Sequence, residues 1–198
     1  MIFNSIDFAI FFPLVFLLFW AFFKKTITPR NLSLIGVSYL FYGWWDWRFL
    51  LLIVMSSGID FFIGQKINIE ESKAARKKWL LVSLFVNLGF LGFFKYFNFF
   101  VDSFISSFSF FGVPLEGFAL KIILPVGISF YTFQTLSYTL DIYYKRLKPT
   151  KDVFAFFAFV SFFPQLVAGP IERAKDLLPQ FTKTNPITYN ALRSGLLL

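Results

Sequence analysis

The segment that decides the fold class is WLLVSLFVNLGFLGFFKYFNFF, at Trp79–Phe100, in which Lys95 is the single charged residue. A helix needs about 20 mostly apolar residues to cross the hydrocarbon core of a bilayer. The segment is long enough and apolar enough for that crossing. It therefore predicts a membrane-spanning helix, and similar apolar runs lie on both sides of it.

Further apolar runs flank this segment, separated by polar or basic stretches. They cover about Ile6–Phe23, Asn31–Trp45, Phe49–Gln65, Ile122–Tyr144 and Val153–Ile171. Residues 102–121 are mixed, with serine alternating with phenylalanine and isoleucine before Gly112-Val113-Pro114, and they predict an interfacial or re-entrant segment. The predicted fold is an all-α, polytopic transmembrane bundle of about five to six spans, with a re-entrant or broken helix.

The composition agrees with a membrane protein. Hydrophobic residues make up 57% of the 198 and charged residues only 15%, where a soluble domain carries about 25%. The 33 phenylalanines are too many for a soluble core of this size. The absence of cysteine excludes disulfides, thiolate catalysis and cysteine metal sites, and the absence of histidine excludes an imidazole base or ligand from this chain. We expect no metal site and no bound cofactor.

The excess of basic residues predicts a topology rather than a nucleic-acid partner. Lys24, Lys25 and Arg30 precede the second run, and the loops at residues 66–78 and 145–151 are also basic. Basic loops mark the cytoplasmic side, so the N-terminus is predicted outside. It lacks the basic n-region and cleavage site of a signal peptide, so the first run is expected to stay as a span. The side of residues 172–190 stays open.

One helix face of the fifth run carries polar residues. Gln134, Ser137, Tyr138 and Asp141 fall at positions i, i+3, i+4 and i+7 of a helix, so they share one face. Polar side chains are costly in hydrocarbon, so this face is expected to point into the bundle or a cavity. Two interpretations stay open, the wall of a substrate tunnel and hydrogen bonding between helices. Asp141 is the weakest candidate, because it precedes Lys145 by four residues.

The sixth run contains helix-breaking residues. Pro164 removes a helical hydrogen bond, and Gly169-Pro170 ends the helix. Irregular backbone at membrane depth persists only inside protein or beside a cavity, which makes Gln165 a candidate lining residue. Arg173 is suited to a phosphate or carboxylate, although a lipid headgroup contact is the favoured interpretation. If this run crosses the membrane fully, the chain from residue 172 onward lies outside. If the run turns back, that part of the chain lies inside.

Isolated features of the other runs have simpler interpretations. Asp60 and Lys95 are lone charges in apolar runs, and we expect both to reach a nearby span end by snorkelling. The cluster Trp44, Trp45 and Trp47 predicts an interfacial anchor.

The last two runs resemble a known family. LPVGISFYTFQTLSYTLDIYYKR at Leu124–Arg146 and FFPQLVAGPIERAKDLLPQF at Phe162–Phe181 look like the membrane-bound O-acyltransferase (MBOAT) family, in its bacterial alginate O-acetyltransferase-like branch. FNSIDFAIFFPLVFLLFW, SYLFYGWWDWRFLLLIVMSSGIDFFIG and GFFKYFNFF resemble the opening spans of that branch. The resemblance covers essentially the whole chain, and together its motifs are specific.

The resemblance implies a multi-pass protein of the bacterial cytoplasmic membrane. It also implies transfer of an acyl group, chiefly acetyl, from a cytoplasmic donor such as acetyl-CoA to hydroxyls of an extracytoplasmic polysaccharide such as alginate, with a partner protein. The family's catalytic histidine lies in the second half of its fold, and this chain has none. Residues 191–198 look like the start of another span, so we expect residues 1–198 to be the N-terminal part of one MBOAT-type domain.

A transporter or flippase subunit, with the broken helix as its conduit, is the alternative. The acyl group, donor, acceptor polymer and oligomeric state stay open.

Overall fold

The computed structural model describes residues 5–22, 26–110, 123–170, 172–184 and 193–194, and within these ranges the chain forms helices and no strands. The predicted all-α fold is confirmed. In chain order the elements are α1 (Ile6–Phe22), α2 (Ile27–Asp46), the 3-10 turn η1 (Trp47–Phe49), α3 (Leu50–Ile69), α4 (Lys73–Phe110), α5 (Ile128–Tyr143), α6 (Val153–Ser161), α7 (Phe163–Ala168) and α8 (Ala174–Thr182).

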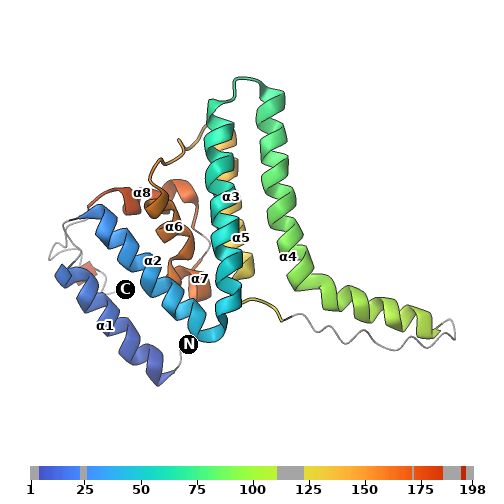
Figure 1. Ribbon diagram of the computed structural model, residues 1–198, viewed down its shortest axis with the longest axis horizontal. Coiled ribbons are helices and arrows are strands. Elements are labelled where there is room, and N and C mark those ends of the chain that lie inside the picture. Colours follow the sequence, from blue (N-terminus) through green and yellow to red (C-terminus); the bar gives the residue numbers. More distant parts are fainter. Residues whose placement is uncertain (1–4, 23–25, 111–122, 171, 185–192, 195–198) are drawn as a thin grey trace.

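Two stretches of the described residues are long and apolar enough to cross a membrane by length and composition, Ile27–Ile69 and Lys73–Phe110. The first of them folds back on itself at η1, so that α2 and α3 are separate helices of 20 residues each (Figure 1). The total number of spans and the N-outside orientation stay predictions.

Helix α4 is longer than its apolar run. It covers 38 residues and continues through Ser103 to Phe110, bending on the way (Figure 1). The hydroxyls of Ser106 and Ser107 each donate to the carbonyl four residues earlier, at 2.8 Å, so these serines stay compatible with a helix. An interfacial course for this part stays a prediction, and residues 111–121 lie outside the described residues.

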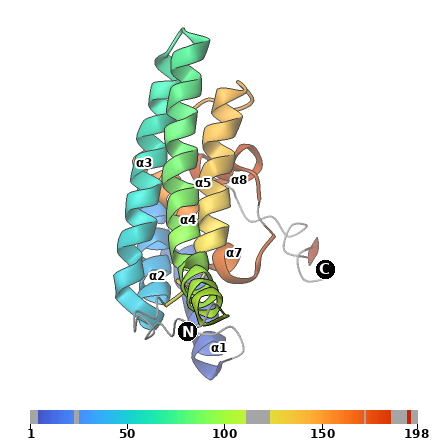
Figure 2. The ribbon, with the colours of Figure 1, turned by 90° about the vertical axis from the view of Figure 1, so that its right-hand side faces the viewer.

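Helices α3, α4 and α5 pack side by side as a three-helix unit (Figures 1 and 2). Gly64 of α3 permits the close approach of α5, because a Cβ at this position would lie 2.6 Å from Cε1 of Tyr138 and 2.9 Å from Cδ1 of Ile142. Small residues at such contacts are typical of helix packing in membranes. The tight contact fixes α5 against α3.

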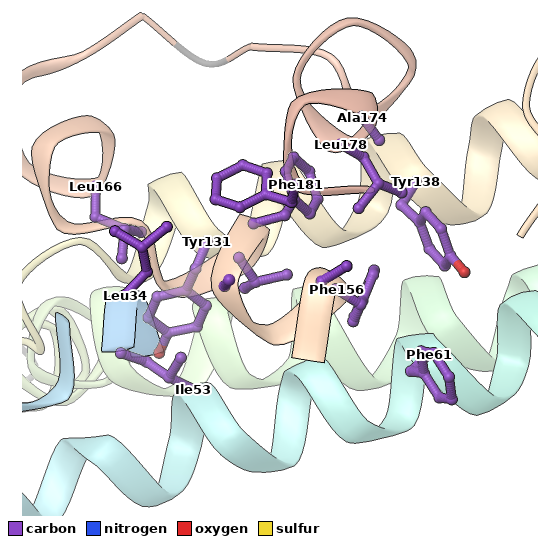
Figure 3. Packing of buried hydrophobic residues seen from close by; sticks show 14 of the residues in the cluster. Leu34, Ile53, Phe61, Tyr131, Tyr138, Phe156, Leu166, Ala174, Leu178 and Phe181 are labelled. Atoms are coloured by element: carbon purple, nitrogen blue, oxygen red, sulfur yellow. The ribbon is translucent and has the colours of Figure 1, made fainter. Parts of the chain in front are cut away.

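Helices α2, α6 and α8 form a second packed group beside α3 and α5. Its core is aromatic and includes the buried Phe156 and Phe181 (Figure 3). Phe159 and Phe163 are also buried, and Phe159 and Phe162 contact Phe181 of α8 edge-to-face. Helix α1 joins through phenylalanine rings on α2 and α7, which contribute about 0.5–1.5 kcal/mol per pair beyond area burial.

The fifth predicted run is wrong at its start, because α5 begins at Ile128 and not at Ile122. Residues 123–127 are not helical, and Gly127, the N-cap, has a φ of +74°. Only glycine adopts that conformation without strain, and a side chain here would also collide with the Tyr42 hydroxyl. The 16-residue helix is therefore short for a full crossing.

The predicted interruption of the sixth run is confirmed. Helix α6 ends at Ser161 and α7 begins at Phe163, because Phe162 leaves the helical region with ψ of 101°. Pro164 lies in the first turn of α7, where its missing N–H removes no helical bond. Helix α7 ends at Ala168, directly before Gly169-Pro170 as predicted.

This broken segment enters the bundle and returns toward the end from which it came. It starts beside Gln65 near the end of α3, reaches Ser38 at mid-depth of α2, and approaches Gly127 at the start of α5. The chain then returns to Ser137, one to two turns from the end of α5. With lengths of nine, six and nine residues, α6, α7 and α8 are each too short to cross, so the geometry favours the half-helix that turns back.

Candidate functional site

The four polar residues on one face of α5, called the α5 stripe below, are Gln134, Ser137, Tyr138 and Asp141, and this face meets the broken segment. Gln134, Tyr138 and Asp141 are buried, with 2%, 0% and 5% exposure, and Ser137 is half-buried. This face of α5 therefore packs against protein, as its helical spacing in the sequence predicted. Whether this face lines a tunnel stays a prediction.

Gln134 joins α5 to the interruption between α6 and α7. Its Nε2 donates to the Phe159 carbonyl at 2.8 Å and lies 3.4 Å from Oε1 of Gln165. Gln165 is buried and donates in turn to the Pro170 carbonyl at 3.2 Å. The structure therefore brings together two residues predicted from separate runs, and both bind backbone that helix breaking has released.

Ser137 joins α5 to α8. Its hydroxyl donates to the Gln134 carbonyl at 2.8 Å and accepts from the backbone N–H of Ala174, the first residue of α8, at 3.2 Å. It thereby satisfies one of the N–H groups that a helix start leaves unpaired. Arg173, the residue before, has an exposed side chain and is not part of this buried group.

Three buried polar atoms on or beside the stripe have no hydrogen-bond partner among the described residues: the hydroxyls of Tyr131 and Tyr138, and Oδ2 of Asp141. The Tyr138 ring packs on Phe156, with centroids 4.5 Å apart (Figure 3). Its hydroxyl lies near the Thr150 backbone without hydrogen-bond geometry. Unpaired buried polar atoms are costly and uncommon, so they mark this face as a candidate site.

Asp60 corrects a prediction, because it does not snorkel. Its exposure is 0% and it lies in the middle of α3, where neither helix end is in reach. Ser83 donates to Oδ1 at 2.6 Å and Asn87 donates to Oδ2 at 2.7 Å, both from α4. A buried carboxylate at this depth persists because neighbouring helices supply its donors.

The network extends to all helices of the three-helix unit. Ser56 and Thr135 donate to Oδ1 of Asn87 at 2.8 and 3.3 Å, and Thr139 lies 3.2 Å from the Ser83 hydroxyl. We call these six residues the three-helix joint: Ser56, Asp60, Ser83, Asn87, Thr135 and Thr139. Each of the three helices contributes two of these residues, four positions apart. This spacing is the sequence signal for the network, and considering Asp60 within its own run alone does not reveal it.

Lys95, by contrast, has an exposed side chain, with its Nζ 5.6 Å from the centre of the Tyr96 ring. Trp44, Trp45 and Trp47 are exposed at the α2–η1 corner. Both placements leave the snorkelling and anchoring interpretations untested.

A groove of about 480 Å³ lies on another part of the molecule. Its walls come from α1, α2, α7 and α8 and are chiefly aromatic, including Phe16, Trp20 and Phe163, with Arg30 and Gln180 as polar members. Pro164 contributes to it, but no residue of the α5 stripe does. In the described part of the chain no cluster of three or more acidic, histidine or cysteine side chains is arranged for a metal ion.

Comparison with known proteins identifies relatives of this chain. It is 44% identical over 154 residues to the probable alginate O-acetylase AlgI of Pseudomonas aeruginosa, a match that covers 77% of this chain and 29% of that protein. The corresponding protein of Azotobacter vinelandii is 42% identical over 154 residues, covering 77% and 30%. The peptidoglycan O-acetyltransferase of Helicobacter pylori is 32% identical over 208 residues, covering 90% and 38%.

The chain thus spans between 29% and 38% of the length of these three relatives. No family model and no solved structure matches it. Its long apolar helices, in a homologue of these acetyltransferases, support a membrane location. The resemblance is confirmed: over about three quarters of its length, the chain is homologous to O-acetyltransferases of the alginate O-acetylase-like branch of the MBOAT family.

Proposed function

We propose that this chain forms part of a multi-pass O-acyltransferase of the bacterial inner membrane. The enzyme moves an acetyl group from a cytoplasmic donor such as acetyl-CoA to hydroxyls of an extracytoplasmic polysaccharide such as alginate. The names of the relatives support acetyl transfer. The structural observation that carries the proposal is the contact of Gln134 with Phe159 and Gln165, which sets the polar face of α5 against a broken helix.

A path through a bilayer needs polar groups that do not face lipid, and this arrangement provides them. The released carbonyls of Phe159 and Pro170 each accept a hydrogen bond from an amide side chain, which is the kind of pairing that irregular backbone needs inside a membrane. In the proposed enzyme, the α5 stripe forms one wall of the path, and residues outside this chain form the rest.

The reaction joins the two substrates at that wall. A general base takes the proton of the acceptor hydroxyl, the oxygen attacks the thioester carbonyl, and an ester forms as the thiolate leaves. The chain has no histidine, so we place the base outside these 198 residues. Hydrogen-bond donors at the wall would stabilise the oxyanion, and the unpaired Tyr138 hydroxyl is the candidate among the described residues.

A chimera tests this proposal. The matching segment of the P. aeruginosa alginate O-acetylase is replaced by this chain, and the chimera is produced in cells that lack their own enzyme. We expect acetylated alginate from the chimera, and no acetyl transfer from acetyl-CoA by the isolated chain in proteoliposomes. Turnover by the isolated chain would show that the base lies within it. A membrane-inserted chimera of normal abundance without acetylation would contradict the proposed role.

A further inference from the structure

Two basic segments lie at the same end of the molecule. The last turn of α3, the α3–α4 turn and the first turns of α4, residues 66–78, stand beside the α5–α6 loop, residues 145–152 (Figures 1 and 2). Together they carry nine basic side chains against three acidic ones, Glu70, Glu71 and Asp152. The exposed basic residues, called the basic surface below, are Lys66, Lys73, Lys77, Lys78, Lys145, Arg146, Lys148 and Lys151.

Hydrogen bonds made by residues in or directly beside the two segments hold them together. Arg76 of α4 donates to the carbonyls of Ile142 and Tyr143 at the end of α5, at 3.2 and 2.5 Å, and lies over the Tyr143 ring. Gln65 of α3 donates to the Thr150 carbonyl at 2.6 Å. The cations of the two segments are therefore held side by side by the fold.

The start of the α5–α6 loop is also fixed. The Asp141 carbonyl accepts from the backbone N–H groups of Arg146 and Leu147, at 2.8 and 3.2 Å. Lys145 has a φ of +59°, a left-handed conformation that this tight turn imposes on it. The guanidinium of Arg146 lies 5.2 Å from the centre of the exposed Tyr144 ring. A cation and an aromatic ring thus share one edge of the loop.

Exposed apolar side chains border the basic surface. Ile69, Tyr144 and Phe154 are 73%, 58% and 42% exposed, and each lies within three residues of an exposed lysine in the sequence. Apolar side chains suit acyl chains, and the adjacent cations suit the phosphates at the bilayer surface. Basic clusters next to membrane helices attract anionic lipids by about 1 kcal/mol per Lys or Arg.

We propose that the basic surface binds the phosphate headgroups of anionic phospholipids. It is a fixed surface, because Arg76 and Gln65 hold its two segments together, and its cations outnumber the anions around them. Lipid binding at this surface does not depend on acyl transfer, and it is measured separately.

Tryptophan quenching by brominated lipids tests it. Trp79 lies beside Lys77 and Lys78, so replacing Trp20, Trp44, Trp45 and Trp47 by phenylalanine leaves one reporter at the basic surface. The chain is reconstituted in phosphatidylcholine vesicles with phosphatidylglycerol, and either lipid carries bromine at the same mole fraction. We expect brominated phosphatidylglycerol to quench Trp79 more strongly, and the preference to weaken as salt is added.

The decisive variant is Lys145→Gln with Lys148→Gln, which we expect to lower the preference for phosphatidylglycerol by about fivefold or more. The matched control, Arg48→Gln with Lys95→Gln, removes two cations elsewhere and leaves the preference unchanged. Lys145→Arg with Lys148→Arg retains it, which separates charge from folding.

Three results would overturn the proposal. One is equal quenching by the two lipids in the starting protein. Another is an equal loss of preference in the two glutamine variants, which would make the effect one of net charge. The third is loss of the preference when millimolar inorganic phosphate is added at constant ionic strength, which would assign the surface to a free phosphate ligand.

Discussion

The three-helix joint and the α5 stripe are both buried and polar, but they differ in how completely they are paired. In the joint, both carboxylate oxygens of Asp60 accept hydrogen bonds, and Oδ1 of Asn87 accepts two. On the stripe, the Tyr138 hydroxyl and Oδ2 of Asp141 have no partner within the described residues. Complete pairing indicates a structural role, whereas unpaired groups indicate a site that other residues or substrates complete.

Both regions use the same helix. Tyr138 and Thr139 are neighbours on α5, yet Tyr138 faces Phe156 of α6 and Thr139 faces Ser83 of α4. The side of α5 with Thr135 and Thr139 is hydrogen-bonded to α4. The side with Gln134 and Tyr138 meets the broken segment, and Tyr138 also packs against Gly64 of α3. The joint therefore holds the proposed wall in place.

The largest expected effect on stability comes from Asp60→Ala. The change leaves the Ser83 hydroxyl and the Asn87 amide without their acceptor, and we expect a loss of about 3 kcal/mol in the free energy of unfolding. Unfolding in mixtures of mild detergent and dodecyl sulfate, followed by circular dichroism, measures it. Ser57→Ala is the control, because this buried hydroxyl on the same helix has no described partner. Equal losses of stability in Asp60→Ala and Ser57→Ala would show that the hydrogen bonds of the three-helix joint do not stabilise the fold.

A smaller loss is expected where the two regions meet, at Gly64. In Gly64→Ala the new methyl collides with the Tyr138 and Ile142 side chains, and overpacking of this kind costs about 1–3 kcal/mol. Gly58→Ala, on the same helix with nothing within 4 Å of the new Cβ, is expected to be neutral or stabilising. The same unfolding measurement compares them, and a neutral Gly64→Ala would show that α3 and α5 are not in close contact.

Gln134→Leu is expected to cost about 1 kcal/mol, because the Phe159 carbonyl loses its donor. Acetylation by the chimera should fall further than this modest loss explains, since the same side chain contacts Gln165 at the break. Acetyl content of the alginate, divided by the amount of folded protein, reports the difference. Unchanged acetylation per folded protein would leave Gln134 with a packing role alone.

Periodicity predicted the features that depend on local sequence. The helical spacing of Gln134, Ser137 and Tyr138 placed them on one buried face, and Pro164 with Gly169-Pro170 predicted the broken helix. The start of α5 was missed because it depends on the left-handed conformation of Gly127 beside Tyr42.

Asp60 was misjudged for a different reason. Its partners come from α4 and α5, and a single run does not reveal which polar residues of other runs lie at the same depth. The other two helices carry matching pairs four residues apart, Ser83 with Asn87 and Thr135 with Thr139. These pairs indicate a shared depth only when the three helices are considered together.

The most direct test of the comparison uses the two neighbours on α5, each of which loses one hydroxyl. In the chimera, acetylation per folded protein and stability are measured for Tyr138→Phe and Thr139→Val. We expect Tyr138→Phe to keep its stability and lose acetylation, and Thr139→Val to lose about 1 kcal/mol of stability and keep acetylation per folded protein. Wild-type acetylation in Tyr138→Phe, or a fall in acetylation only in Thr139→Val, would contradict the assignment of the two faces.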